Sequence, residues 1–266
     1  MAAKATSSAL AVDGADHTFG SRTLDTGSDV WEHNAWDHVP PPPEHDAHVA
    51  EVLARQAEHP VAPADAARFH AHAPAYWDAF YTRHENRFFK DRQWLKLEFP
   101  ELVAATRADA GAQTILEVGC GAGNTVFPLL AANANPALRI VACDYAPQAV
   151  QVVREHPLYT PPCGTCAAHT WDLSTPGLPP GVAPGSVDAV VLIFVLSALH
   201  PDEWAQAARN VHAALRPGGL VLLRDYGRHD LPQLRFRKNR MLADNFYVRG
   251  DGTRVYFFTA DELYAI

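Results

Sequence analysis

The chain lacks any apolar run long enough to cross a membrane. Its most apolar stretch, residues 187–199, is too short and is interrupted by Asp188, so we interpret it as a buried parallel strand. The first 25 residues contain few cations and no apolar core, which argues against a mitochondrial leader or a signal peptide. We therefore expect a cytoplasmic protein without a membrane segment.

Cysteine is also scarce, and the four cysteines present fit a reducing compartment. Cys163 and Cys166, with His156 and His169 nearby, could supply half of a zinc site. A second pair of ligands at a recognised spacing is missing. We therefore interpret this segment as a loop with two thiols and expect no metal site.

An excess of positive charge is missing as well. The formal net charge of −8 argues against a protein that coats nucleic acid over its whole surface. Any nucleic-acid site must then be a local patch. The length of 266 residues and the apolar content of 48% suit one large domain, or a domain with an extension.

Residues 115–124, which read ILEVGCGAGN, contain an apolar run that ends in three glycines at alternate positions. An alanine- and leucine-rich segment follows, so the pattern predicts a strand, a glycine turn and a helix. The turn lacks the spacing of a dinucleotide site, because the third glycine comes one residue early. It fits E-x-G-x-G-x-G, the pattern of class I S-adenosylmethionine (SAM) methyltransferases, with Glu117, Gly119, Gly121 and Gly123. A glycine turn in any α/β protein is the alternative.

From residue 113 onward, strand and helix signals alternate, which predicts a mostly parallel sheet with helices on both faces. The expected strands lie near 114–119, 139–143, 166–170, 187–194 and 219–225. The expected helices lie near 123–132, 146–155 and 202–215, and two more are expected at 45–55 and 65–83. We divide the chain into a disordered tail (1–18), an N-terminal extension (19–112) and a Rossmann-like domain (113–266).

Acidic residues fall at the ends of the next two expected strands. Asp144 ends the second strand, where a carboxylate can accept hydrogen bonds from ribose hydroxyls. Asp172 ends the third, where it can accept from an adenine amine, beside apolar contacts from Leu173 and Ile193. Each acid alone is more often a cap or a turn residue. Together with the glycine pattern, they are strong evidence for a SAM site.

Two further stretches have two explanations each. The aromatic residues from Trp77 to Phe89 form either a core-facing stripe or a lid over a cofactor. Between Arg216 and Arg254, nine cations outnumber four anions, which gives a local excess of positive charge. Phe236, Phe246 and Tyr247 lie among these cations, as stacking on unpaired bases would require. The competing account is a solvated helix face with a few core aromatics.

Five segments carry a resemblance to a known family. They are residues 76–81 (YWDAFY), 84–92 (HENRFFKDR), 192–198 (LIFVLSA), 223–227 (LRDYG) and 245–259 (NFYVRGDGTRVYFFT). They resemble the tRNA 3-methylcytidine methyltransferases of the methyltransferase-like family, from about Phe19 to the last residue. Residues 19–37 resemble the branch that modifies position 32 of threonine, arginine or serine tRNAs.

The resemblance implies a SAM cofactor and a tRNA substrate held by its anticodon arm. It implies that SAM is contacted by Trp77, Tyr81, Gly119, Asp144, Asp172, Leu173 and Ile193. It also implies that residues 19–37 and the helices up to Arg92 hold the anticodon arm. A helper protein that delivers the tRNA, such as an aminoacyl-tRNA synthetase, is left open.

The implied reaction is displacement at the sulfonium methyl by cytosine N3, which requires no strong base. Because the product base is cationic, a nearby carboxylate would stabilise it. We expect Asp225 to supply this catalytic carboxylate, and the alternative is that Asp225 pairs with Arg224 or Arg228. The cations expected to contact tRNA are Arg87, Lys90, Arg92, Arg237, Lys238, Arg249 and Arg254.

The chain stops at residue 266, in what reads as the first turns of a helix. The last helix and antiparallel hairpin of a usual class I sheet would lie beyond it. We expect a fragment or a shortened form with an exposed sheet edge. A non-catalytic RNA-binding scaffold and a small-molecule SAM methyltransferase remain as alternative functions.

Overall fold

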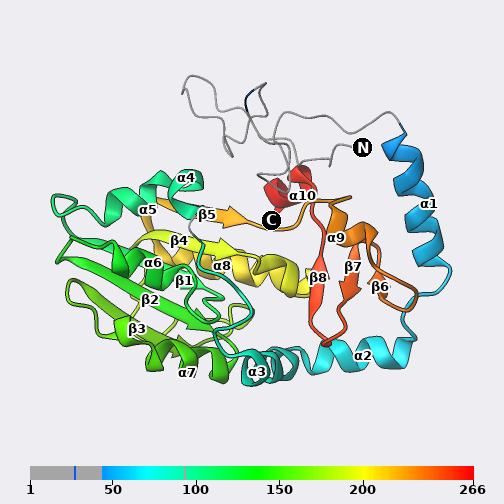
Figure 1. The fold of residues 1–266 in the computed structure, drawn as a ribbon, viewed down its shortest axis with the longest axis horizontal. Coiled ribbons are helices and arrows are strands. Elements are labelled where there is room, and N and C mark those ends of the chain that lie inside the picture. The colour runs from blue at the N-terminus through cyan, green and yellow to red at the C-terminus, as the bar shows by residue number, and fades with distance from the viewer. Residues whose placement is uncertain (1–26, 28–43, 93) are drawn as a thin grey trace.

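The computed structural model describes residues 27, 44–92 and 94–266 (Figure 1). The predicted tail at 1–18 and the segment 19–37, apart from Gly27, lie outside the described residues. Within them, the chain forms a parallel sheet layered between helices and a smaller antiparallel sheet beside it.

The large sheet has the order β3-β2-β1-β4-β5, and all of its strands are parallel. The strands are β1 (Gln113–Val118), β2 (Leu138–Asp144), β3 (Thr165–Thr170), β4 (Val187–Ile193) and β5 (Leu215–Arg224). All five predicted strands are therefore confirmed. β5 begins earlier than predicted, because Leu215 already pairs with Val187 and residues 216–219 form an irregularity before Leu220 pairs with Ala189.

One apolar cluster covers each face of the sheet. Residues of α4 (Leu95–Glu98), α5 (Pro100–Ala105), α6 (Val126–Ala131) and α7 (Pro147–Glu155) pack on one face. Residues of α8 (Trp204–Ala214), joined by Phe246 and Tyr256, pack on the other. Short 3₁₀ turns lie at Pro157–Tyr159, Leu196–Ala198 and Pro201–Glu203. The predicted helix at 123–132 is shorter, since Gly123 at its start has a φ of 82°.

The small sheet lies beside both the first helix and the last helix of the described chain (Figure 1). It contains β6 (Met241–Ala243), β7 (Phe246–Val248) and β8 (Arg254–Tyr256), preceded by α9 (Leu231–Leu234). The helices α1 (His45–Ala57) and α2 (Pro63–Ala71) lie beside it. The predicted helix at 65–83 is two helices, because the chain leaves helical geometry at His72 before α3 (Ala73–His84) begins.

Buried amide side chains join α1 to the small sheet. Gln56 donates to the carbonyl oxygens of Gln233 (3.0 Å) and Phe236 (3.1 Å). The Tyr247 hydroxyl donates to Gln56 Oε1 at 2.8 Å. Gln56 is 3% exposed, so these bonds replace hydration that the amide loses on folding.

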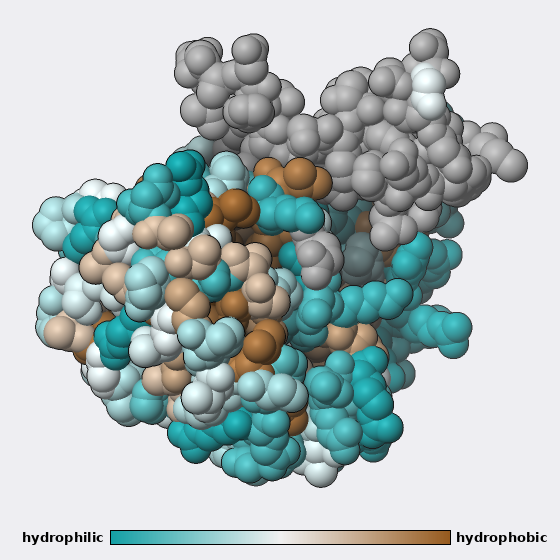
Figure 2. Space-filling view, turned by 60° about the vertical axis from the view of Figure 1, so that its left-hand side comes forward, coloured by the Kyte–Doolittle hydropathy of each residue, from teal (hydrophilic) through white to brown (hydrophobic). Residues whose placement is uncertain are grey.

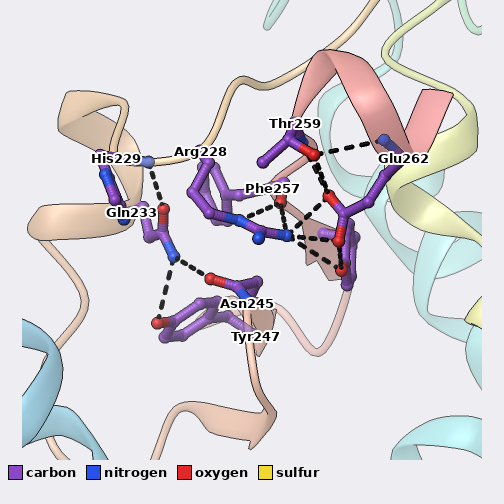
Figure 3. A network of polar contacts seen from close by, with 9 residues as sticks. Arg228, His229, Gln233, Asn245, Tyr247, Phe257, Thr259 and Glu262 are labelled. Atoms are coloured by element: carbon purple, nitrogen blue, oxygen red, sulfur yellow. Dashed lines mark hydrogen bonds and ion pairs between the residues drawn. The ribbon is translucent and has the colours of Figure 1, made fainter. Parts of the chain in front are cut away.

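The last helix, α10 (Ala260–Ala265), is fixed by a polar network around Arg228 (Figure 3). The Arg228 guanidinium donates to both oxygens of Glu262 at 2.7 Å. Glu262 also closes a capping box with Thr259. The hydrogen bonds and the Arg228 charge outweigh partial burial and lower the Glu262 pKa to about 2. The network explains why a helix of six residues is ordered against the body of the protein.

The outer edge of β5 pairs with no strand among the described residues. Leu220 and Val221 are 44% and 45% exposed on this edge strand. Figure 2 shows small groups of apolar residues separated by polar ones on the face that it presents. The predicted open edge is therefore present in the described part of the fold.

Replacing Gln56 by Ala should lower the free energy of unfolding by about 2–4 kcal/mol, because three partners, two of them buried, lose their hydrogen bonds. Urea unfolding measures the change. Arg55→Ala is the matched control on the same helix, since Arg55 is exposed and its pair with Glu51 is at the surface. Equal stability of the two variants would contradict this role for Gln56.

Candidate active site

A cavity of about 310 Å³ opens where the large sheet, α3 and the β7–β8 hairpin meet. Its volume is at the lower end of what small-molecule sites require, which is roughly 300–1,000 Å³. Seven predicted cofactor residues line it, namely Trp77, Tyr81, Gly119, Asp144, Asp172, Leu173 and Ile193. The cavity lies at the carboxyl ends of parallel strands, where ligands of such sheets bind.

The glycine turn brings β1 close to the end of β2. Gly119, Gly121 and Gly123 all have positive φ values of 63°, 53° and 82°, which L side chains rarely adopt. A Cβ on Gly121 would also collide with the Tyr81 hydroxyl. Gly121 and Gly123 do not line the cavity, so their role is to shape the turn.

Asp144 receives two backbone hydrogen bonds at this turn. Its Oδ2 accepts from the Gly121 amide and its Oδ1 from the Ala146 amide, both at 2.9 Å. Burial raises the Asp144 pKa to about 6, against the lowering effect of these donors. Each carboxylate oxygen keeps a lone pair, so Asp144 can still accept from the hydroxyls of a ribose.

Asp172 also lines the cavity. Its Oδ1 accepts from the backbone amide and the hydroxyl of Ser174, at 2.8 and 2.7 Å. Asp172 therefore serves as a turn residue and also lines the cavity. Leu173 and Ile193 are 4% and 2% exposed and give the same region an apolar surface.

The segment 87–92 is bonded to the glycine turn through Arg92. The Arg92 backbone amide donates to the Asn124 carbonyl at 3.0 Å, and its guanidinium donates to the Thr125 hydroxyl at 2.9 Å. The same guanidinium lies 3.5 Å from the Glu117 carboxylate, and the Arg92 side chain is 15% exposed. Arg92 was expected to contact tRNA. Its guanidinium is paired with Glu117 while Arg92 also lines the cavity, so the contact with tRNA stays a prediction.

Glu117 is 2% exposed and does not line the cavity. Burial raises its pKa to about 7, although the Arg92 charge opposes this shift. Its predicted role as a cofactor contact is therefore corrected. Glu117 holds Arg92, and through it the segment 87–92, against the turn that shapes the cavity.

The aromatic residues of α3 and the following segment surround the cavity mouth. Trp77 and Tyr81 stack at 6.1 Å between ring centroids, and Phe80 contacts Phe88 at 4.9 Å. Phe88 and Phe89 are 56% and 38% exposed while they line the cavity. Such exposure is inconsistent with a core stripe and favours the lid interpretation.

Asp225 is close to the cavity but does not line it. Its oxygens accept from the backbone amides of Ser197 (3.0 Å) and Tyr226 (2.9 Å). Burial raises its pKa to about 6. The catalytic role that we expected is not supported by this geometry, and Asp225 instead positions the Ser197 loop.

The alternative interpretation of Asp225, an ion pair with a neighbouring arginine, is wrong. Arg224 pairs with Glu98 at 3.0 Å and lies over the Trp94 ring. Arg228 pairs with Glu262.

The basic tract divides into exposed and buried cations. Arg237 and Lys238 are exposed, as are Arg87 and Lys90. Arg254 is 3% exposed and lies 3.5 Å from Glu203, so its predicted contact with tRNA is corrected. A buried guanidinium charge is tolerated in the fold when a carboxylate beside it, here Glu203, neutralises it.

The aromatics of the same tract belong to the core. Phe246 and Tyr247 are 1% and 0% exposed, and Phe236 stacks on Tyr247 at 4.7 Å. They cannot stack on unpaired bases without unfolding of the small sheet. The core aromatics of the competing account are present at Phe246 and Tyr247, but its solvated helix face is not, because α9, the described helix of this tract, has only four residues, Leu231–Leu234.

Residues outside the predicted set complete the cavity. They are chiefly Phe194, Ser197, Tyr226, Asp251 and Thr253, and Arg249 joins them from the predicted tRNA contacts. The last three belong to the 245–259 segment, whose sequence carries the family resemblance and part of the local positive charge but did not predict a place in the cavity. The glycines on either side of Asp251 were the available signal, because they indicate a tight hairpin turn.

The described residues contain no group of three His, Cys, Asp or Glu side chains placed to hold a metal ion. Cys163 and Cys166 are free thiols. No helix in this part of the chain is both long enough and apolar enough to cross a membrane.

The carboxylates, glycine turn and aromatic lid fit S-adenosylmethionine. Asp144 suits its ribose, Asp172 and the apolar wall suit its adenine, and Gly119 lines the same cavity without a side chain. Among solved structures, the fold resembles a Pyrococcus horikoshii protein, with a TM-score of 0.50 and 16% identity over 72% of this chain and 86% of that one.

Residues 116–221 match the family described as a methyltransferase domain. The chain is 48% identical over 93% of its length to the tRNA N(3)-methylcytidine methyltransferase of Schizosaccharomyces pombe, covering 80% of it. It is 43% identical over 92% of its length to the tRNA N(3)-cytidine methyltransferase of Danio rerio, covering 77% of it.

A third relative is the tRNA(Thr) (cytosine(32)-N(3))-methyltransferase of Saccharomyces cerevisiae, at 51% identity over 92% of this chain. The chain spans only 39% of that longer protein. Similarity of this extent, over nearly the whole chain, shows that the chain belongs to the family of tRNA N(3)-methylcytidine methyltransferases.

Proposed function

We propose that this chain methylates cytosine N3 at position 32 in the anticodon loop of certain tRNAs, with S-adenosylmethionine as the methyl donor. The observation that carries the proposal is the cavity itself. Its lining includes the predicted cofactor residues Asp144 and Asp172 and also the polar residues Arg249 and Asp251. A cofactor and a flipped base require polar groups for both within one shared space.

The bound cofactor supplies a methyl group on a positively charged sulfur. The protein has no need of a strong base, because cytosine N3 is unprotonated near neutral pH. Its residues hold and align the reactants. Asp144 accepts from the ribose, Asp172 from the adenine amine, and Trp77 and Tyr81 cover the cofactor and exclude water.

The exposed cations form the proposed tRNA surface. Arg237 and Lys238 lie between α9 and β6, next to the small sheet. Arg87 and Lys90 lie in the segment after α3, which also carries Phe88 and Phe89 of the cavity lining. Cations at both places suit a phosphate backbone that passes over the cavity. The N-terminal extension at 19–112 contributes α1, α2 and α3 to this surface. The segment 19–37 is proposed to contact the anticodon arm as well.

The same proposal places the protein in the cytoplasm, where its free thiols stay reduced. A partner that delivers the tRNA, such as an aminoacyl-tRNA synthetase, belongs to the same proposal. Sequencing of modified tRNAs from a deletion strain identifies which tRNAs are methylated.

The proposal predicts that the chain binds SAM in calorimetry and then transfers a labelled methyl group to bulk tRNA, with 3-methylcytidine as the product. Digestion of the tRNA and mass spectrometry of the nucleosides identify the modified base. Absence of binding heat would favour an RNA-binding scaffold. Binding without tRNA methylation would favour a small-molecule methyltransferase or an inactive fragment.

Asp144→Asn should weaken SAM binding by about tenfold to 100-fold, as expected when a hydrogen bond to a charged acceptor is lost. Because the Asp144 pKa is raised to about 6 and only the carboxylate accepts two hydroxyl protons, wild-type affinity should fall as the pH drops through about 6. Calorimetry between pH 5 and 8 measures both effects. Asp109→Asn, an exposed carboxylate paired with Arg107, should change neither.

Charge reversal at Arg237 and Lys238 should weaken tRNA binding by about tenfold or more and reduce its salt dependence, while SAM affinity stays unchanged. Filter binding at several salt concentrations measures the effect. Arg107→Glu is the matched control, because Arg107 is an exposed cation that precedes β1, at the opposite end of the sheet. Equal loss of tRNA and SAM binding would indicate misfolding instead.

A further inference from the structure

Residues 249–253, at the tip of the β7–β8 hairpin, contribute side chains to the lining of the cavity. Arg249, Asp251 and Thr253 line it, as do Tyr226 and Phe194. From this placement, and resting on the proposed function, we propose that Arg249 and Asp251 together recognise the Watson–Crick edge of the target cytosine. Asp251, rather than Asp225, then faces the charge that develops on the base.

The hairpin tip is held in one conformation. Gly252 has a φ of 87°, and a Cβ there would collide with the ring of Tyr76 on α3. The Arg249 amide donates to the Thr253 carbonyl at 2.8 Å, and the Gly252 amide donates to the Arg249 carbonyl at 3.1 Å. The tip therefore packs against the same helix that carries Trp77 and Tyr81.

Asp251 uses one oxygen to hold the turn. Its Oδ1 accepts from the Thr253 amide at 2.9 Å and from the Thr253 hydroxyl at 2.7 Å. Among the described residues, no hydrogen-bond donor or cation contacts its Oδ2. The side chain is exposed and lines the cavity. Its orientation is thus fixed by Thr253, while one oxygen remains available to a ligand.

Arg249 is fixed in a similar way. Its Nη1 donates to the Arg254 carbonyl at 3.1 Å and contacts the Thr253 hydroxyl at 3.4 Å. Its guanidinium lies over the Tyr226 ring, 5.5 Å from the centroid. Nε and Nη2 have no partner among the described residues, so donors remain for a ligand. A cation and a carboxylate two residues apart thus line the same cavity.

This pair is complementary to cytosine. The cytosine edge presents an amine donor at N4, the nucleophilic N3 and an acceptor at O2. Asp251 can accept from N4 and Arg249 can donate to O2, which leaves N3 free between them. Uracil presents a carbonyl at position 4 and a protonated N3, so it would place an acceptor against the Asp251 carboxylate. Such a mismatch rejects a base more strongly than a missing contact does.

Aromatic rings provide the flat surface that a base needs in the cavity. Phe194 and Tyr226 contact each other with 4.8 Å between centroids, and both line the cavity. Phe194 has a φ of 59°, an uncommon conformation for a phenylalanine. Strain of this kind is typical of functional sites. The hydrogen bonds of Asp225 to Ser197 and Tyr226 support the same wall.

The charge balance of the reaction gives Asp251 its second role. The N3 lone pair forms a bond to the methyl carbon while the carbon–sulfur bond breaks, and the electrons of that bond stay on sulfur. No proton is transferred in this step. The positive charge therefore moves from the sulfonium to the pyrimidine, which shares it with N4. A carboxylate at N4 is placed to stabilise that charge as it develops.

The test compares Asp251→Asn with Asp244→Asn, a matched change at an exposed carboxylate between β6 and β7. Asparagine can still accept the Thr253 hydrogen bonds, so the turn is kept. Asp251→Asn should lower kcat by about 100-fold, the size reported for loss of one group that stabilises transition-state charge. The SAM affinity should stay within about twofold, and KM for tRNA should rise by less than kcat falls, because the contacts to the tRNA backbone are unchanged. Asp244→Asn should leave kcat unchanged, and equal rates of the two variants would overturn the proposal.

A binding experiment tests the base preference of the proposed pocket independently of catalysis. Anticodon-arm hairpins that carry 3-methylcytidine, cytidine or uridine at the target position are titrated onto the protein saturated with S-adenosylhomocysteine. The wild type should bind the 3-methylcytidine hairpin about tenfold more tightly than the uridine one, and Asp251→Asn should remove this preference. Equal wild-type affinities would overturn the assignment. Preference without methyl transfer to tRNA would instead reject the proposed activity while keeping the base pocket.

Discussion

The hydrogen bond from the Gly121 amide to the Asp144 carboxylate is the contact on which the site depends. It joins the turn after β1 to the end of β2, at 2.9 Å. The bond requires glycine, because Gly121 has a positive φ and lies against Tyr81 of α3. One contact thus sets the distance between the two strand ends and leaves room for the lid. Buried in this way, Asp144 keeps a fixed orientation toward a ligand.

Three acidic residues near the strand ends have raised pKa values for the same reason, which is burial, yet their partners give them different roles. Asp144 and Asp225 are each held by two backbone amides. Glu117 has Arg92 beside it instead. Only Asp144 lines the cavity. Burial of a carboxylate near a site therefore does not by itself identify a catalytic group, and the direction of its free oxygens decides its role.

The cavity is completed by segments far apart in the chain. α3 supplies Trp77 and Tyr81, the large sheet supplies Asp144 and Ile193, and the hairpin at residues 249–253 supplies Arg249 and Asp251. Phe246 and Tyr256 of the small sheet pack in the same apolar cluster as residues of the large sheet. Because the two sheets share this core, the cavity residues that they carry keep a fixed relation to each other.

The sequence by itself predicted the parallel sheet and seven of the residues that line the cavity. Apolar runs, glycines and acids at strand ends favour the same local structure whatever the rest of the chain does. The sequence could not determine which cations are free. Arg254 and Arg92 resemble Arg237 in sequence, but Glu203 and Glu117 neutralise the first two inside the fold. Nor could it show that Asp251 reaches the cavity while Asp225 stops short of it. Those outcomes depend on packing between residues distant in sequence, and only the tertiary structure decides them.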